Sequence, residues 1–295
     1  MERDQTAAMD LARSMWLRLE TVHAVTYFGQ ETTDAGAGLG LGGFWAGYFA
    51  FRAAPMGPVA PGVVEATFFN FAPTFVRRWV PDVWDRATPD VIMPARSAAA
   101  ATTLRRVHPD VADAAAIVNP ILRRAAGEGV AAGRPLFAAN RTLDVPADPV
   151  EELWHWTTCL REHRGDGHVA ALTAAGVDGL QAHVLIALEQ GASPEDLQRT
   201  RGWTADDWSD AVARCRDRGW VDASGTLTDI GRAVRLEVEA TTDRLATQPF
   251  DALAAADAEV VLRTLTPVAI AISSSGTIRY PNPMGLPAAH ELLAD

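Results

Sequence analysis

The stretch SPEDLQRTRGWTADDWSDAVARCRDRGWVDASGTLTDIGRAVR, residues 193–235, decides the fold. It contains two helix starts in quick succession, because Ser193 with Pro194 behind it, and then Thr204, are residue types that favour the first positions of a helix. After the second helix, WVD, the turn DASGT and LT predict two short strands. A final long helix is expected from residue 229 to about 247, and the preceding GLQAHVLIALEQG predicts another helix.

The order of these elements resembles a winged helix-turn-helix of the MarR type over residues 179–247. Four further motifs extend the resemblance: HAVTYF (23–28), GYFAFRAAPMG (47–57), EHRGDGH (162–168) and VEATTDRLATQPFDAL (238–253). With these motifs, the chain is similar to an actinobacterial family of winged-helix-containing proteins. The resemblance implies a fold over most of the chain, but it implies no activity.

The residues before this unit predict helices. Apolar side chains recur every three or four positions over residues 9–32. The following AGAGLGLGG is expected to link helices, because its G-x-G-x-x-G letters follow a helix, whereas a dinucleotide-binding fold needs a strand there. We therefore predict a mainly α-helical protein in three parts: an aromatic-rich helical domain over 1–148, a winged-helix domain with a two-stranded wing over 149–250, and a C-terminal helix and tail over 251–295.

The composition excludes several classes of function. All 26 basic residues are arginine, so P-loop nucleotide binding and lysine-held pyridoxal phosphate, which both need a lysine, are excluded. Cys159 and Cys215 lack C-x-x-C or zinc-finger spacing and are expected to be buried thiols. No segment has the length of a membrane span or the pattern of a secretory signal. A cytoplasmic homodimer is predicted.

The charge distribution argues against nucleic acid as a partner. The net charge is −11, and residues 171–250 contain eight arginines against thirteen acidic residues. The third helix of this fold would enter the major groove, yet here it begins with Asp206, Asp207 and Asp210. Carboxylates in that position would meet the phosphate backbone. We therefore expect the winged helix to serve packing and dimerisation rather than DNA binding.

Polar side chains are concentrated in LREHRGDGH, residues 160–168. Asp166 is expected to cap a new helix, so that the turn before it brings His163, Arg164 and His168 together. Such a cluster suits an anionic substrate, and His163 and His168 suit a transition metal or a heme iron. The alternative is structural, with Arg164 and Asp166 tying two helices together while the histidines bond to backbone carbonyls.

The first helix carries a polar stripe of Glu20, His23, Tyr27 and Glu31, spaced three and four residues apart. E-x-x-H on a helix presents a carboxylate and an imidazole to one metal, but the second copy that a di-iron bundle needs is missing. His23 and Tyr27 are expected instead to transfer protons in a reaction. The alternative is a solvated or interdomain face.

An aromatic segment supplies the third candidate site. Trp45 and Tyr48 lie on an apolar helix together with Arg52, which follows Tyr48 by one turn. A buried arginine needs an anion, either a protein carboxylate or a ligand. We predict that Trp45, Tyr48 and Arg52 bind a ligand, with Arg164 and Asp166 beside them; the alternative is an aromatic core.

These features together predict a small-molecule-binding protein, and we favour an enzyme of secondary or oxidative metabolism. The predicted catalytic residues are His23, Tyr27, His163 and His168, with heme or a transition metal as candidate cofactors. In the same hypothesis, Arg52 holds an anionic group of the substrate. The alternatives are a ligand-responsive transcriptional regulator and an inert interaction scaffold.

Overall fold

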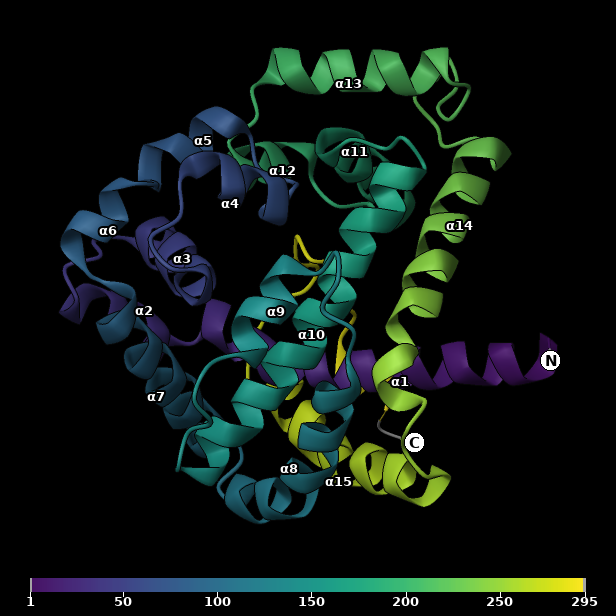
Figure 1. Cartoon of the computed structure of the whole chain (residues 1–295). Coiled ribbons are helices and arrows are strands. Elements are labelled where there is room, and N and C mark those ends of the chain that lie inside the picture. Colours follow the sequence, from purple (N-terminus) through teal and green to yellow (C-terminus); the bar gives the residue numbers. More distant parts are fainter. Residues whose placement is uncertain (1, 294–295) are drawn as a thin grey trace.

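The structure, a computed structural model, describes residues 2–293, and its regular elements are helices (Figure 1). Helix α10 runs through the centre of the molecule, α1 crosses near it, and α13 lies outermost at one end (Figure 1). The helices are α1 Glu2–Phe28, α2 Gln30–Gly38, α3 Phe44–Ala53, α4 Pro61–Phe68, α5 Pro73–Trp79, α6 Asp82–Arg86, α7 Pro89–Val107, α8 Val111–Glu128, α9 Pro135–Arg141, α10 Pro149–Ala174, α11 Gly179–Gln190, α12 Pro194–Arg201, α13 Ala205–Asp217, α14 Asp229–Ala246, α15 Ala255–Ser274 and α16 Ala289–Leu292, with 3-10 turns at Ala54–Met56 and Gln248–Phe250.

One large core joins the two ends of the chain. Helix α1 packs against α10 and α15, and α8 packs against the same two partners. Its fully buried side chains include Met15, Val22, Leu122 and Leu265. Full burial of each such side chain contributes about 1.5–3 kcal/mol relative to exposure. The C-terminal helix is therefore part of the same core as the first helix.

Two smaller clusters lie beside this core. The first is aromatic and comes from α3, α4 and α5, with Phe49 and Phe68 stacked at a centroid distance of 5.8 Å. The second lies inside the helix-turn-helix and contains Val184 and Cys215. Cys215 and Cys159 are both free and buried, which confirms the prediction for the cysteines.

Helices α11, α12 and α13 form the helix-turn-helix, and their starts follow from local chemistry. Ser193 Oγ caps α12 by accepting a 3.1 Å hydrogen bond from the backbone of its first turn. Thr204 caps α13 reciprocally with Asp207, each side chain bonding to the other's backbone amide. Gly191 and Gly202 end α11 and α12 in the left-handed conformation. The two predicted caps are confirmed.

The predicted two-stranded wing is wrong. In its place the described chain has a tight turn with a single antiparallel bridge, between Val221 and Leu227. The carboxylate of Asp222 closes this turn, because it accepts a 2.9 Å hydrogen bond from the amide of Thr226. Thr228 then caps α14. Since the turn and the cap together use these residues, none remain for a second strand.

The predicted turn at EHRGDGH is also wrong, because α10 continues through it without a break. Its glycines serve close packing: a Cβ at Gly167 would lie 2.8 Å from a guanidinium nitrogen of Arg134. Asp166 caps no helix. Its carboxylate instead accepts a 2.9 Å hydrogen bond from the amide of Phe137 in α9. The polar motif thus joins neighbouring helices rather than ending one.

The helix-turn-helix is docked on the aromatic helices α4 and α5. The amide of Ala72 donates to the carbonyl of Arg201 at 2.9 Å, and the indole of Trp203 donates to the carbonyl of Asn70 at 3.0 Å. Gly202 has a φ of 77°, and a Cβ there would come within 2.2 Å of an aromatic side chain of α5. This contact orients Arg201, the last residue of α12.

No single helix of residues 2–293 combines the length and the apolar composition that crossing a bilayer requires. The pair α10 and α11 meets both limits when taken together, but the two helices are bent by 98° relative to one another.

Candidate ligand-binding site

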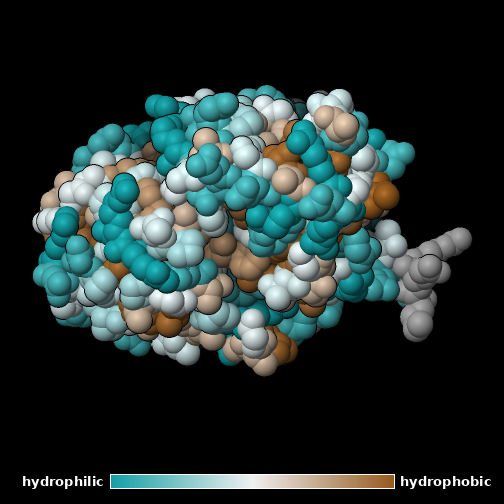
Figure 2. All heavy atoms as spheres, turned by 90° about the horizontal axis from the view of Figure 1, so that it is seen from above, coloured by the Kyte–Doolittle hydropathy of each residue, from teal (hydrophilic) through white to brown (hydrophobic). Residues whose placement is uncertain are grey.

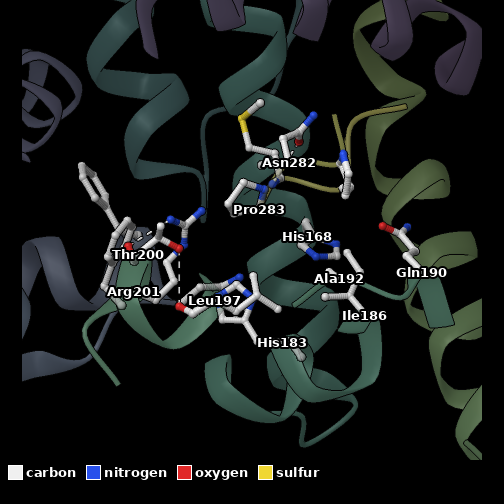
Figure 3. A pocket seen from close by; sticks show the side chains of 18 of the residues that line it. His168, His183, Ile186, Gln190, Ala192, Leu197, Thr200, Arg201, Asn282 and Pro283 are labelled. Carbon is white, nitrogen blue, oxygen red and sulfur yellow. Dashed lines mark hydrogen bonds between the residues drawn. The ribbon is translucent and has the colours of Figure 1, made fainter. Parts of the chain in front are cut away.

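A cavity of about 720 Å³ lies between the aromatic helices, the helix-turn-helix, α14 and the segment after α15. Pockets of roughly 300–1,000 Å³ are typical of sites for drug-sized molecules. Its walls come from segments far apart in the sequence, so the cavity exists only in the folded chain. Figure 3 shows His168 of α10, His183 and Ile186 of α11, Leu197 and Arg201 of α12, and Asn282 and Pro283 of the C-terminal segment lining it.

Aromatic rings form the wall on the side of α3. The rings of Trp45 and Tyr48 lie 5.6 Å apart, and the ring of Phe71 lies 5.5 Å from that of Tyr48. The guanidinium of Arg201 lies over the Phe71 ring at 4.7 Å. The structure therefore brings the predicted residues Trp45 and Tyr48 to the cavity, where they offer flat apolar surfaces beside a cation.

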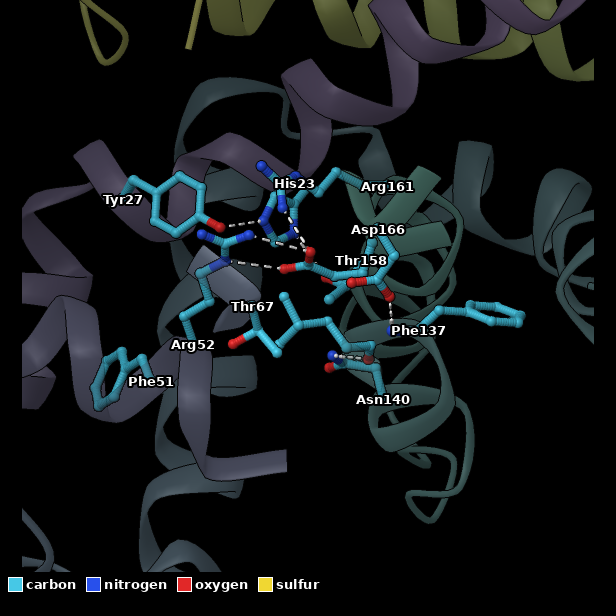
Figure 4. A network of polar contacts seen from close by, with 12 residues as sticks. His23, Tyr27, Phe51, Arg52, Thr67, Phe137, Asn140, Thr158, Arg161 and Asp166 are labelled. Carbon is cyan, nitrogen blue, oxygen red and sulfur yellow. Dashed lines mark hydrogen bonds and ion pairs between the residues drawn. The ribbon is translucent and has the colours of Figure 1, made fainter. Parts of the chain in front are cut away.

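A network of buried charged side chains, part of which is drawn in Figure 4, adjoins the cavity, and its members Glu20, Arg52 and Arg161 line the cavity wall. Glu162 of α10 is 1% exposed and pairs with Arg161 at 2.6 Å and Arg52 at 3.2 Å. Arg161 also pairs with Glu20 at 3.1 Å. Burial raises the pKa of Glu162, but the two guanidiniums outweigh burial and lower that pKa to about 2. Arg52, predicted to hold a ligand anion, is therefore neutralised by a protein carboxylate.

His23 and Tyr27 lie beside these ion pairs and bond to one another. Nε2 of His23 is 2.9 Å from the Tyr27 hydroxyl, and its Nδ1 is 2.8 Å from the hydroxyl of Thr158 (Figure 4). Burial lowers the pKa of His23 and raises that of Tyr27, so both are neutral. Tyr27 lines the cavity, and His23 lies behind it. Proton transfer through this pair stays a prediction.

The wall formed by α10 and α14 carries balanced charges. Arg164 pairs with Asp243 at 2.8 Å and Glu239 at 3.5 Å. Nδ1 of His168 lies 2.9 Å from the hydroxyl of Thr242, and burial lowers the pKa of His168 to about 4. Both residues line the cavity. Since Arg164 already has two carboxylate partners, its charge does not call for a ligand.

The residues predicted for a metal do not share one site. His163 and His168 are five positions apart on an unbroken helix, so they point about 140° apart. The His163 ring packs on Phe137, with centroids 4.9 Å apart, and neither His163 nor Asp166 lines the cavity. The described residues contain no group of three or more His, Cys, Asp or Glu side chains placed to hold a metal ion. The side chains present do not fit a shared metal.

Two residues of the helix-turn-helix that the sequence analysis did not single out also line the cavity. Arg201 is half-buried, and it has no carboxylate of the described chain within ion-pair distance; its hydrogen bond goes to the carbonyl of Thr200 at 3.2 Å. His183 is 2% exposed, and its Nε2 has no hydrogen-bond partner. The available signal was a histidine inside the apolar run GLQAHVLIAL, and an arginine directly before the glycine that ends α12.

Comparison with known proteins agrees with this architecture. Neither the curated proteins nor the solved structures include a match to the chain. A family described as a helix-turn-helix family matches residues 12–279, a range that includes the aromatic helices, the helix-turn-helix and every wall of the cavity except the segment 281–285. Because this match covers most of the sequence, the chain belongs to that helix-turn-helix family.

Proposed function

We propose that this protein binds a small molecule in the cavity between α3 and the helix-turn-helix. The observation that carries the proposal is the cavity itself, about 720 Å³ in volume, with an aromatic wall and buried charged groups at one end. Mostly apolar pockets with a few convergent polar groups are the usual form of small-molecule sites. In this proposal, α11, α12 and α14 serve as walls of the site. The Tyr27–His23 pair supports an acid–base role, but on its own it defines no reaction.

The second part of the proposal is that α13 does not bind DNA. Asp206 and Asp210 are exposed at its start. The arginines nearby are engaged within the protein: Arg214 pairs with Asp178 at 3.1 Å, and the Arg216 guanidinium donates to a backbone carbonyl at 3.3 Å. The face that carries α13 is largely hydrophilic (Figure 2). The carboxylates at the start of α13 would be repelled by a phosphate backbone.

A ligand-responsive regulator is the second candidate. The family match favours it, and so does the contribution of α11 and α12 of the helix-turn-helix, and of α14 after it, to the cavity wall. A ligand in the cavity would touch the unit that carries α13. In this case the protein would shift its own upstream DNA in a gel, in a salt-dependent manner, and a ligand would change the shift. Absence of any shift removes this candidate.

The cavity can be tested with a neutral fluorescent probe, N-phenyl-1-naphthylamine. We expect its emission to rise on binding to the native protein and to stay low with Ala192→Trp, since Ala192 lines the cavity between α11 and α12 (Figure 3). Ala213→Trp is the matched control, because Ala213 is exposed on α13. Equal binding to both variants, or no binding to the native protein, would contradict the proposed function.

A further inference from the structure

We infer that the ligand is a flat aromatic hydroxy acid whose carboxylate pairs with Arg201 and whose hydroxyl donates a hydrogen bond to Nε2 of His183. This inference rests on the proposed function, because it assigns the chemical class of the molecule in the same cavity. It follows from three properties of the site: its charge balance, its flat walls, and the Nε2 atom of His183, which is buried without a hydrogen-bond partner beside Arg201.

The charge balance of the buried end is positive. Three guanidiniums, those of Arg52, Arg161 and Arg201, line this part of the cavity, and two carboxylates, those of Glu20 and Glu162, oppose them. Both carboxylates are bound to Arg52 and Arg161, so the charge of Arg201 is the one left over. Burial lowers the pKa of Arg201, Tyr48 raises it and Arg52 lowers it again, so these groups share one polar region. A ligand with one negative charge would neutralise it.

Neighbouring groups do not supply the missing charge. Asp166 lies behind Glu162, outside the cavity, and burial raises its pKa to about 7, so it is only partly ionised near neutral pH. Arg96 adds a further buried cation, bonded to the carbonyl of Phe51 at 2.8 Å and to Asn140 at 2.9 Å rather than to a carboxylate. Of the other arginines that line the cavity, Arg279 also lacks a carboxylate partner among the described residues, but it is exposed.

The surroundings of Arg201 favour a planar carboxylate. A guanidinium presents parallel N–H donors that match the two oxygens of a carboxylate. Here the guanidinium is already held flat over Phe71 at 4.7 Å, and the rings of Tyr48 and Trp45 continue the same wall. An aromatic body attached to the carboxylate would therefore lie along these rings while its charged end meets Arg201.

His183 is the reason for inferring a hydroxyl group on the ligand. Burial and the neighbouring Arg201 lower its pKa to about 3, so the ring is neutral and has one donor and one acceptor nitrogen. The backbone carbonyl of Asn70 raises this pKa against burial, and Nε2 has no hydrogen-bond partner. With the ring proton on Nδ1, Nε2 is an acceptor, and a carboxylate cannot bond to it. A hydroxyl on the same ring, one position removed from the carboxylate so that it cannot bond to it internally, satisfies Nε2 while Arg201 holds the anion.

Three naphthalene probes separate these contributions in isothermal titration calorimetry on the full chain. The first is 4-hydroxy-2-naphthoate, the second is 2-naphthoate, which lacks the hydroxyl, and the third is 4-hydroxy-2-naphthamide, which lacks the charge. We expect the hydroxy acid to bind roughly tenfold or more tightly than the amide, since hydrogen bonds to charged groups are the stronger kind. The acid without the hydroxyl should fall between them.

Variants assign the preferences to residues. Arg201→Gln should abolish the preference for the acid over the amide, Arg201→Lys should restore part of it, and His183→Phe should equalise the two acids. Arg263→Gln is the control, because Arg263 is 70% exposed on α15 and makes the same change in charge. If the native protein binds acid and amide equally, or if the preference survives in Arg201→Gln, the inference is wrong, whether or not His183→Phe folds.

The neutral probe separates the two proposals. If N-phenyl-1-naphthylamine binds and Ala192→Trp blocks it while the naphthalene acids show no preference, the cavity function stands and the hydroxy-acid inference falls. If the neutral probe also fails to bind the native protein, both fall.

Discussion

The helix-turn-helix has two faces with opposite electrostatic character. On the inward face, Arg201 and His183 line the cavity; in the part of the chain that the structure describes, Arg201 has no carboxylate partner, and Nε2 of His183 has no hydrogen-bond partner. On the outward face, α13 presents Asp206 and Asp210 to solvent, while Arg214 is paired with Asp178. The half-buried cation of this unit, Arg201, thus points into the protein, whereas Arg216 and Arg218, which also lack a carboxylate partner among the described residues, are exposed to solvent.

This difference indicates that a ligand of this protein binds on the inward face of the helix-turn-helix. Exposed charges interact weakly because water screens them, whereas a half-buried cation without a counterion is costly and favours a bound anion. The seam between α12 and α5 holds Arg201 in place through the bond from Ala72 to its carbonyl. The helix-turn-helix therefore contributes to the site as a rigid wall.

The largest expected effect comes from Glu162→Gln, which leaves Arg52 and Arg161 without their shared carboxylate. We expect the free energy of unfolding to fall by about 3–5 kcal/mol, because removal of one partner strands buried charge. Urea unfolding measures it. Glu259→Gln is the outward control: Glu259 is 75% exposed in a 3.9 Å pair, and its loss should matter by less than about 1 kcal/mol. If both variants lost the same free energy of unfolding, buried and exposed ion pairs would not differ in their contribution to stability.

The next effect, of similar size, is the loss of stability in acid, which comes mainly from the buried histidines of α10 and α11. Burial lowers the pKa values of His155 and His168 to about 4 and those of His163 and His183 to about 3. Their folded pKa values lie below the unfolded value of about 6.5, so their contribution to stability is present above that pH and is lost as the pH falls. Each contributes about 1.4 kcal/mol per pH unit below 6.5.

Asp166 acts in the opposite direction, because its folded pKa is raised to about 7 and its protonation therefore favours the folded state. Between pH 7.5 and 5.5 we expect a net loss of about 5 kcal/mol, from these four histidines and His23, whose pKa burial also lowers, opposed by one carboxyl. Urea unfolding at both pH values measures this loss. Asp166→Asn should steepen it. Equal or greater stability at pH 5.5 would show that the histidines are not buried in neutral form.

The helices of the helix-turn-helix could be predicted from local sequence signals. The wing and the turn in α10 were predicted wrongly, because side-chain contacts that the local sequence does not show decide these regions. Ser193 and Thr204 cap their helices through bonds within one turn, so residue type alone was sufficient. The prediction of a two-stranded wing was wrong because the Asp222 side chain, which looks in the sequence like an ordinary turn residue, accepts a hydrogen bond from the amide of Thr226 and so forms a tight turn. The expected turn in α10 failed because Gly167 accommodates Arg134, a contact between residues far apart in the sequence.

The same division applies to the site. His23 and Tyr27 are four residues apart on one helix, so their contact could be predicted from spacing. Arg52 was correctly expected to need an anion, but its partner, Glu162, is 110 positions away. Arg201 was missed because what distinguishes it is the absence of a partner. That absence depends on how every neighbouring carboxylate is used, which no local pattern records.

A smaller effect tests directly whether Arg201 lacks a charged partner within the protein. Arg201→Gln should raise the free energy of unfolding of the ligand-free protein by about 1 kcal/mol, because it removes a half-buried charge that nothing compensates. The outward control Arg214→Gln breaks an exposed pair and should lower stability by less than about 1 kcal/mol. Thermal and urea unfolding compare the two variants. A clear loss of stability in Arg201→Gln would mean that the protein itself already balances this charge.

The smallest expected effect concerns the outward face. Neutralising Asp206 and Asp210 to Asn should raise affinity for a random-sequence duplex by less than tenfold, because the arginines around them remain engaged: Arg214 with Asp178, and Arg218 over the Trp220 ring at 3.6 Å. Fluorescence anisotropy of a labelled duplex across a salt series measures it. Tight binding by the native protein with a steep salt dependence would require several arginines to leave these partners for phosphates. DNA binding by the outward face would then be the main function, and an anion bound at Arg201 would act by changing that DNA binding.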